Sequence, residues 1–439
     1  MSSGMDFSKM TVIQLKAYAK ENGIKFKSNL NKSGLVELLE KHAEITRSDE
    51  EEEEDDNQRP ESSWTVKQVK AFAESKGIKI PSKVTRKDLM IEFVNGYLDE
   101  LDIGYDPTET GETKVKYKKV IPVYADLEKY KKFGKKAFAA HLMEHGWTVV
   151  PEVLSPEFVQ ETTDEFFRWL SQCSAETPIN PEDPETWSYD AFPHGGPHGI
   201  IKNYIGQETF IWNVRREVKP VFDLLYTPKK GDPIDLVSSY DGAVFSLPNE
   251  KETFNSWFHS DYPRDMDLHA MTCVQGIACL TDSFENDGGF CFILPPEENI
   301  GDFLERYYQR HPSSGIVWGK MNMNDEEISK CDIYKICANA GDVILFDSRL
   351  IHCNAPPRVD DETANYRMAV YVSFQPRDNV EEETATARIK LFEEGRMSGH
   401  WCFGSWFSPA PKDYHSYGKS KIEPPDLNQP DYDDVKDMI

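Results

Sequence analysis

The chain has 439 residues, 39% hydrophobic and 12% aromatic, which is long enough for a large core and more than one domain. Its formal net charge of −26 disfavours non-specific attraction to nucleic acid or anionic membranes, although many acidic residues lie in discrete runs. No apolar stretch approaches the length of a membrane span and no signal-peptide core is present, which predicts an intracellular protein, cytoplasmic or nuclear and not secreted. The eight cysteines lack paired metal-ligand spacing and are expected to be reduced core residues.

The first predicted elements belong to an internal repeat within residues 1–100. The segment that starts at Thr11 recurs without a gap at Thr65, and each copy predicts a helix, a glycine stop, a short connector and a second helix. Thr11 and Thr65 are expected to be the N-caps. Such helix-extended-helix units resemble SAP modules, which often hold DNA or RNA. A solvated lysine face on a small helical domain is the alternative.

Composition divides the chain into six segments. They are a helical module at 1–46, an acidic linker at 47–62, a second helical module at 63–100, a linker at 101–126, a large domain at 127–418 and an acidic tail at 419–439. The acidic run at 49–56 should stay disordered because its like charges repel one another. The tail is rich in proline and acid, and is expected to be frayed.

The large domain begins with predicted helices. Apolar stripes at helical spacing place them at 127–144, 156–170 and 210–226, with a later helix at 385–396. The intervening segment 171–202 is rich in proline, glycine and acid, and is predicted to be a loop. Its histidines His194 and His198 are either plain exposed loop residues or part of a lid over an active site.

Predicted strands at 236–247 and 273–280 flank the segment that contains His259 and Asp261. Residues two apart on a strand point to one face, so these two side chains can offer a nitrogen and an oxygen to one point. A third donor, His352, ends the apolar run 341–352. Two histidines and a carboxylate form the facial triad of non-haem Fe(II) oxygenases, which leaves open positions on the metal. For His259 alone, a hydrogen-bonded core histidine is the alternative.

After a polar loop, residues 366–374 alternate as a strand does. The alternation puts Arg367 on one face with Ala369, Tyr371 and Ser373. An arginine on an otherwise apolar strand needs an anionic partner, and a guanidinium–carboxylate pair could grip one end of a dicarboxylic co-substrate. Arg358, within the loop, is the alternative anchor.

Together these motifs resemble the phytanoyl-CoA dioxygenase group of Fe(II)- and 2-oxoglutarate-dependent oxygenases over residues 137–408. The matching stretches are 145–155, 257–261, 274–280, 287–289, 341–352 and Arg367. The stretch 399–404 resembles a closing element of a fungal-type branch. The resemblance implies an α+β fold with a double-stranded β-helix (jelly-roll) core and flanking helices, preceded by the two helix-extended-helix modules.

The resemblance also implies the site. His259, Asp261 and His352 would bind Fe(II), and Arg367 would bind the C5 carboxylate of 2-oxoglutarate. No separate catalytic acid or base is expected beyond the metal ligands, because the metal carries the difficult chemistry.

Two amide side chains are further candidates. Gln275 is either a hydrogen-bond donor to the co-substrate or a satisfied core amide. Asn354, two residues beyond His352, is a second candidate donor in the same pocket.

Three classes of function are compatible with these residues. The leading one is a dioxygenase that uses Fe(II), 2-oxoglutarate and O₂ to hydroxylate a C–H bond of a small organic molecule, lipid-like or a secondary metabolite. The second is an oxygenase directed to nucleic acid or chromatin by residues 1–100, and the third is a non-catalytic nucleic-acid-binding protein. The acidic oxygenase half argues against a catalytic groove that tracks a phosphate backbone. The intact triad argues against the non-catalytic class.

Overall fold

The computed structural model describes much of the chain but not all of it. The described residues are 32–34, 36, 39, 60–75, 86–87, 90–91, 94, 120–125, 136–173, 175–193, 199–201, 205–228, 232–248, 258–263, 266–294, 299–311, 319–355, 357, 365–402, 415–416 and 420–439. The chain falls into two compact units, Met1–Glu61 and Ser62–Ile439. The expected module at 1–46 and the acidic linker at 47–62 therefore lie largely outside the described residues.

The second expected module is described in part. Helix α3 (Val66–Ser75) begins after Thr65, whose hydroxyl accepts a hydrogen bond from the Gln68 N–H at 3.3 Å. The Gln68 side chain accepts in return from the Thr65 N–H at 2.9 Å, which completes a capping box. This confirms the predicted N-cap. Val69 and Ala73 on the helix are buried.

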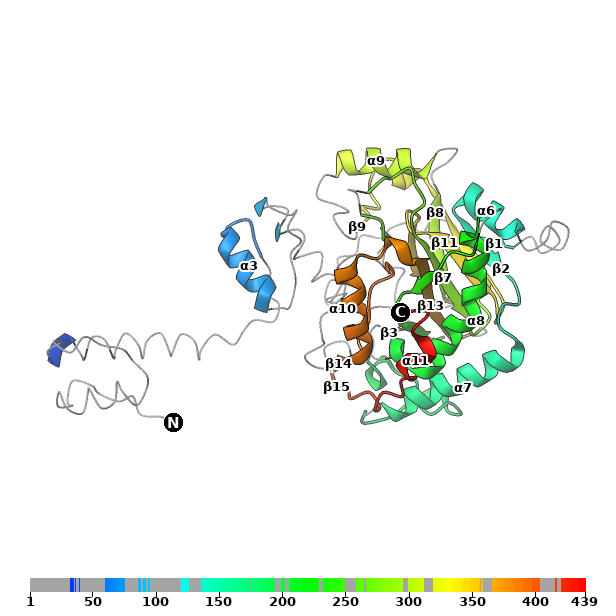
Figure 1. Cartoon of the computed structure of the whole chain (residues 1–439), viewed down its shortest axis with the longest axis horizontal. Coiled ribbons are helices and arrows are strands. Elements are labelled where there is room, and N and C mark those ends of the chain that lie inside the picture. Colours follow the sequence, from blue (N-terminus) through cyan, green and yellow to red (C-terminus); the bar gives the residue numbers. More distant parts are fainter. Residues whose placement is uncertain are drawn as a thin grey trace. The chain divides into compact units, whose positions relative to one another are not determined.

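Two sheets form the core of the large domain (Figure 1). The seven-stranded sheet has the order β2-β11-β7-β13-β5-β3, with β4 paired to β13, and the six-stranded sheet has the order β1-β10-β8-β12-β6-β9. The strands of the first are β2 (Trp147–Val150), β3 (Ile200–Ile201), β4 (Leu236–Ser238), β5 (Ala243–Ser246), β7 (Val274–Cys279), β11 (Val343–Asp347) and β13 (Arg367–Pro376). Those of the second are β1 (Val120–Tyr124), β6 (His259–Ser260), β8 (Gly289–Leu294), β9 (Gly319–Lys320), β10 (Asp332–Cys337) and β12 (Ile351–Ala355). A hairpin of β14 (His415–Ser416) and β15 (Ser420–Lys421) is separate.

Strand alternation sorts the side chains of both sheets into an interior and two outer layers. On β13, Ala369 and Tyr371 point into the interior between the sheets, as Phe290 of β8 does from the opposite side. Met368 and Val370 point the other way, into the layer between the seven-stranded sheet and the helices. The predicted alternation of 366–374 is thus confirmed. The fold is mixed α+β with mostly antiparallel sheets, consistent with the expected double-stranded β-helix.

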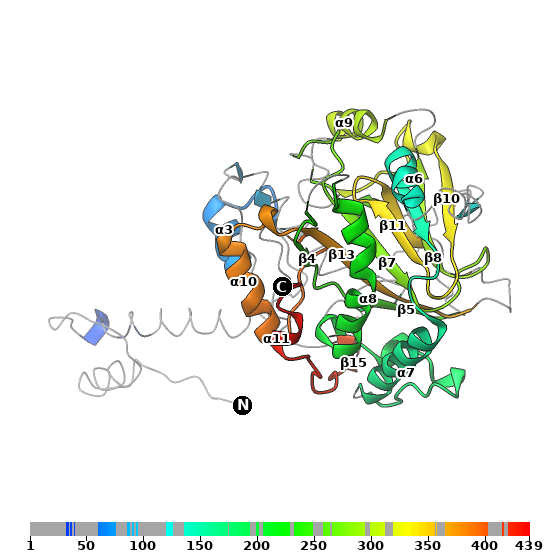
Figure 2. The same ribbon diagram turned by 45° about the vertical axis from the view of Figure 1, so that its right-hand side comes forward.

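Helices cover the outer faces of the sheets (Figure 2). They are α6 (Ala137–His145), α7 (Pro156–Gln172), α8 (Thr209–Tyr226), α9 (Ile300–Arg310), α10 (Glu382–Glu393) and α11 (Tyr432–Val435). Helix α7 begins where the Ser155 hydroxyl accepts from the Phe158 N–H at 3.2 Å. Helix α8 packs Phe222 on Phe374 of the seven-stranded sheet with ring centroids 5.3 Å apart, and α9 covers the six-stranded sheet through Phe303 and Tyr307.

The tail departs from the expectation that it is frayed. Val435, Met438 and Ile439 are buried in the layer that also holds α8, and the Met438 carbonyl accepts from the Ser238 N–H at 2.8 Å. These few apolar residues are scattered among acids, so composition alone hides them. The hydrophobic contact that they make nevertheless suffices to order the segment.

The expected linker at 101–126 also needs correction. Its residues Val120–Tyr124 form β1, which pairs in parallel with β10 along the edge of the six-stranded sheet. The Tyr124 hydroxyl donates to the Glu285 carboxylate at 3.0 Å and fixes the end of this strand. The domain therefore begins before residue 127. Elsewhere, all eight cysteines are buried and unpaired with one another, as expected.

A buried carboxylate ties the segment after β9 to α9. Asp325 accepts from Arg310 Nε and Nη2, both at 3.0 Å, and lies 2.9 Å from His311 Nε2. Burial alone would raise the pKa of Asp325, but the hydrogen bonds from Arg310, His311 and backbone N–H groups outweigh it and hold the pKa below its ordinary value. The ionised carboxylate therefore stabilises the fold above the ordinary Asp pKa of about 4, and this stability is lost as the pH falls through the lower folded-state pKa.

Asp325→Asn should accordingly lower the free energy of unfolding at pH 7 by on the order of 3 kcal/mol, because it removes the buried carboxylate that Arg310 and His311 share and leaves Arg310 with Glu327 as its ion-pair partner. The difference from wild type should shrink as the pH falls into the acid range. Denaturant unfolding at several pH values measures both effects. The exposed neighbour Glu326 supplies the control: Glu326→Gln should match wild type, and a similar loss in both variants would contradict this role for Asp325.

Candidate metal centre

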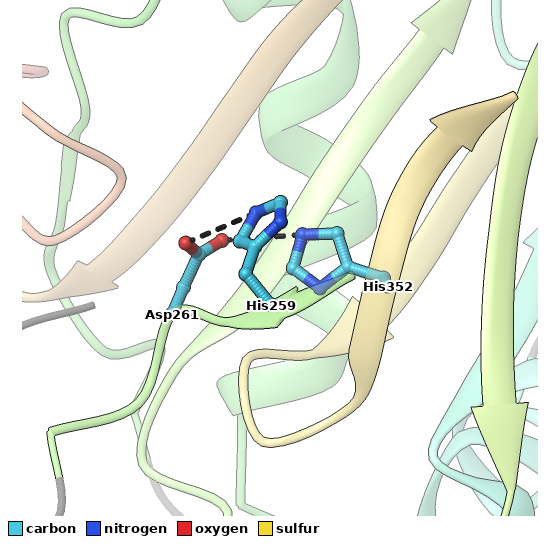
Figure 3. Close-up of side chains that lie close together, drawn as sticks. All are labelled: His259, Asp261 and His352. Atoms are coloured by element: carbon cyan, nitrogen blue, oxygen red, sulfur yellow. Dashed lines mark ion pairs between the residues drawn. The ribbon is translucent and has the colours of Figure 1, made fainter. Parts of the chain in front are cut away.

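The two strands that carry the expected histidines are neighbours in the six-stranded sheet. His352 of β12 pairs directly with His259 of β6. The side chains of His259, Asp261 and His352 converge from these strands (Figure 3). Strand β6 ends at Ser260, so Asp261 lies just beyond the strand rather than within it. The turn of the chain there still directs its carboxylate toward the two imidazoles.

The donor atoms of the three side chains lie close together. Asp261 Oδ1 is 3.5 Å from His259 Nε2, and Asp261 Oδ2 is 3.3 Å from His352 Nε2. One ligand atom from each residue lies within 4.8 Å of the other two. All three residues are buried, with exposed fractions of 5%, 8% and 6% for His259, Asp261 and His352, so the cluster belongs to the interior. A core histidine with an ordinary partner would not need a second imidazole and a carboxylate at this spacing.

A backbone contact to the ring nitrogen that faces away from Asp261 fixes the orientation of His352. Its Nδ1 lies 2.9 Å from the Leu350 carbonyl oxygen. A carbonyl can only accept, so Nδ1 carries a proton, and Nε2 is the nitrogen that can bind a metal once it is deprotonated. The ring also stacks on Phe290 at 5.3 Å and contacts Phe346 at 4.8 Å. These apolar neighbours close one side of the cluster to water.

The carboxylate of Asp261 is held by segments far away in sequence. Burial opposes its ionisation, but the charges of His259 and His352 outweigh burial and hold the pKa of Asp261 well below its ordinary value. The Trp401 indole N–H donates to the Asp261 backbone carbonyl at 3.0 Å. The Gln275 amide donates to Asp261 Oδ2 at 2.9 Å. The first contact holds the backbone at Asp261, and the second restricts how its side chain can turn.

Gln275 thus faces the interior, as its place on β7 predicts, but its amide N–H₂ is engaged with protein. Besides Asp261 it contacts Ser348 Oγ at 3.2 Å. This partner set makes it an orienting residue for the carboxylate. A role toward a co-substrate stays a prediction.

Gln275→Leu should therefore weaken metal binding by about 10–100-fold, the usual cost of losing a partner that orients a ligand. Titration with Co(II), followed by its visible d–d absorption, measures the affinity. Ser348→Ala is a matched control, because it removes the other contact of Gln275 and leaves the bond to Asp261 in place. Equal affinities in Gln275→Leu and wild type would show that the bond does not position the carboxylate.

Arg367 and Asn354 lie on the same interior surface as the three donors. Asn354 is two residues beyond His352 on β12 and accepts from Arg367 Nη1 at 3.2 Å. Its amide donates to the Tyr371 hydroxyl at 3.0 Å. Arg367 is only 3% exposed, and no carboxylate of the described residues forms an ion pair with it. A buried guanidinium in that state is incomplete without an anion.

Several expected residues cannot be placed. Arg358, Trp257, His194 and His198 lie outside the described residues, as does the SAP-like connector of each module. The choice between Arg358 and Arg367 as anchor therefore depends on the position of Arg367 alone.

Sequence reasoning did not assign roles to Trp401, Ser348 or His400. His400 Nδ1 lies 3.0 Å from Asp241 Oδ1, and its Nε2 lies 3.9 Å from Asp261 Oδ2. The resemblance of 399–404 to a closing element was the one available signal, and it did not indicate which atoms are contacted. The structure places His400 and Trp401 of this segment beside Asp261.

Comparisons with known proteins give only distant likenesses. No family model matches the sequence, and no curated protein matches it. Among solved structures, the epimerase SnoN in complex with Fe³⁺, alpha ketoglutarate and nogalamycin RO is 16% identical, with a TM-score of 0.35 and coverage of 55% of this chain and 83% of that chain. HygX from Streptomyces hygroscopicus with nickel and 2-oxoglutarate bound is 14% identical, with a TM-score of 0.34 and coverage of 55% and 86%. At this level they do not assign the chain to a family.

A further observation concerns membranes. Among the residues that the structure describes, no helix combines the length and the apolar character needed to cross a bilayer.

Proposed function

We propose that the chain is a non-haem Fe(II)- and 2-oxoglutarate-dependent oxygenase that acts on a small organic molecule. The observation that carries the proposal is the convergence of His259, Asp261 and His352 in the interior between the two sheets, with their donor atoms within 4.8 Å of one another. Two imidazoles and one carboxylate on one side of a metal suit Fe(II) and leave positions open for other ligands. When bound there, Fe(II) and 2-oxoglutarate supply the oxidation of a C–H bond by O₂.

The donor set fits such a metal in four respects. Nitrogen and carboxylate oxygen are ligands that iron accepts, and the buried position protects it from hydrolysis and loss. The proton on Nδ1 of His352 leaves Nε2 as the donor atom. Gln275 occupies one oxygen of Asp261, which favours binding of the metal through the other oxygen.

Arg367 supports 2-oxoglutarate as the co-substrate. Its buried guanidinium has an amide oxygen of Asn354 as partner and lacks a carboxylate among the described residues. A dicarboxylate that reaches from the metal toward β13 would supply the missing negative charge through its distal end. In this proposal Asn354 and Tyr371 hold the guanidinium in place, Gln275 orients Asp261, and Phe290 and Phe346 exclude water.

Succinate release tests the proposed reaction class. The full chain would be incubated with Fe(II), 2-oxoglutarate and O₂, with panels of small metabolites and of oligonucleotides. Stimulation by a metabolite favours the proposed substrate class, whereas stimulation by oligonucleotides alone would favour an oxygenase directed to nucleic acid. A protein that binds neither Fe(II) nor 2-oxoglutarate would contradict the proposal.

The contribution of residues 1–100 to nucleic-acid binding is likewise a prediction, since most of them lie outside the described residues.

A further inference from the structure

A second group of buried polar side chains lies next to the segment that contains His400. Two of its members are arginines on different helices, Arg215 of α8 and Arg388 of α10, and both are fully buried. Arg215 Cζ lies 4.5 Å from the centre of the Trp212 ring, and Arg388 Cζ lies 4.5 Å from that of Tyr240. The two rings are 5.6 Å apart. The two cations therefore share one small region of the interior.

Much of the hydrogen-bonding capacity of this region has no protein partner. Arg215 Nη2 donates to the Asp241 carbonyl at 2.9 Å, and Arg388 Nη2 donates to the Ser238 carbonyl at 2.6 Å. Within the described chain, however, Arg215 Nε and Nη1 and Arg388 Nε have no partner. The same is true of four other buried atoms around them: Tyr240 Oη, Asp241 Oδ2, Ser373 Oγ and Gln375 Nε2.

Contacts between these residues show that the unsatisfied atoms belong to one region. Arg388 Nη1 donates to the Cys402 carbonyl at 3.4 Å, and the Cys402 N–H donates to Gln375 Oε1. The Cys402 thiol contacts the Ser373 carbonyl at 3.7 Å. Buried polar groups in folded proteins are nearly always hydrogen-bonded. The number of buried polar atoms here without a protein partner therefore indicates that atoms from outside the chain bind them.

The balance of charge around Arg215 and Arg388 indicates whether the region holds an ion or only water. No carboxylate of the described residues forms an ion pair with Arg215 or Arg388, and Asp241 is the acidic side chain whose charge acts on Arg215. Burial raises the pKa of the Tyr240 phenol to about 12, and that of the Cys402 thiol also to about 12, so neither is negative near neutral pH. Two buried cations thus face one carboxylate, that of Asp241, whose Oδ1 also lies 3.0 Å from His400 Nδ1. An uncompensated buried charge is strongly unfavourable.

We propose that Arg215 and Arg388 hold a small monovalent anion of the chloride class, with ordered water at Tyr240 and Gln375. A monovalent ion matches the single unbalanced positive charge. The proposed ion is a small one because both arginines are fully buried. The anion would tie α8 and α10 to Cys402, and the neighbouring Trp401 donates to the Asp261 carbonyl. The site does not depend on the proposed oxygenase function.

Crystallography with bromide in place of chloride tests the site directly, because bromide scatters anomalously. The full chain would be dialysed against sodium bromide and crystallised without chloride. The expected result is an anomalous peak within hydrogen-bonding distance of the guanidinium groups of Arg215 and Arg388. Ordered water at that place, with bromide confined to the protein surface, would overturn the proposal.

Thermal unfolding supplies the test in solution. At constant ionic strength, replacement of gluconate by bromide should raise the midpoint by a few degrees and then saturate, because the anion binds the folded state alone. Arg388→Met should remove this response, whereas Lys390→Met, an exposed cation on the same helix, should keep it. A wild-type midpoint that follows ionic strength alone would also overturn the proposal. If Arg388→Met does not fold, the wild-type map and titration still decide.

Discussion

Replacement of His352 with alanine is expected to abolish the binding of Fe(II) and, with it, the metal-dependent binding of 2-oxoglutarate. The remaining donors, His259 and Asp261, cannot hold a metal on three sides. The loss of metal affinity should exceed the roughly 10–100-fold decrease that follows removal of a residue that only orients a ligand. Anaerobic titration of the metal-to-ligand charge-transfer band measures both binding events, and Asp261→Ala should give the same result.

A second cluster of metal-ligand residues, which contains one histidine, provides the control. His269 lies 3.7 Å from the carboxylates of both Asp302 and Glu305, but all three residues are exposed. Exposed acidic groups of this kind are common at protein surfaces. His269→Ala should leave the charge-transfer band unchanged. If His269→Ala removes the band while His352→Ala retains it, the metal site has been placed in the wrong cluster.

Arg367→Ala should raise the 2-oxoglutarate requirement by orders of magnitude and leave Fe(II) binding largely intact. Truncation of one partner of a buried charge pair costs about 2–5 kcal/mol, which corresponds to a roughly 30- to several-thousand-fold loss of affinity. The separation of the two effects follows from the structure, because Arg367 contacts Asn354 and is not one of the three clustered donors. Isothermal titration of the Fe(II) protein with 2-oxoglutarate measures the change.

Arg358→Ala is the matched control for this variant. In the sequence Arg358 precedes Asp360 and Asp361, acidic residues that could satisfy it, so its loss is predicted to change the 2-oxoglutarate requirement little. Arg367→Lys is a second control, since it keeps the charge but cannot form the bidentate pair and should recover only part of the affinity. If Arg358→Ala has the larger effect, the assignment of the anchor to β13 is wrong.

Local periodicity explains what the sequence could predict. The alternation of 366–374 fixes which side chains of β13 face the interior, and the helical stripe of 156–170 corresponds to α7. Both are patterns within one element, and burial of the apolar face is enough to select them. The spacing of His259 and Asp261 also depends only on neighbouring backbone. The strand and the helix therefore agree between the sequence and the structure, whereas Asp261 lies just beyond β6 and not on the predicted strand.

Contacts between distant segments could not be predicted in this way. The Trp401 indole meets the carbonyl of Asp261 across 140 residues, and the tail reaches the main core through four scattered apolar residues, Ile422, Val435, Met438 and Ile439. No periodic pattern in the sequence predicts either contact, because both depend on how the sheets curve and on which loops lie between them. Gln275 shows the same limit: its strand and face are predictable, but its choice of Asp261 as partner is not.

The parallel strand β1 has a consequence for how shortened forms of the chain should behave. Val120–Tyr124 covers one side of β10, which otherwise would present a row of unpaired N–H and C=O groups to solvent. Such open edges template strand addition between molecules. A chain that begins at residue 127 would retain all three clustered donors and yet be expected to self-associate. Solubility, rather than catalysis, would then limit work with the isolated domain, and a start before Val120 should avoid it.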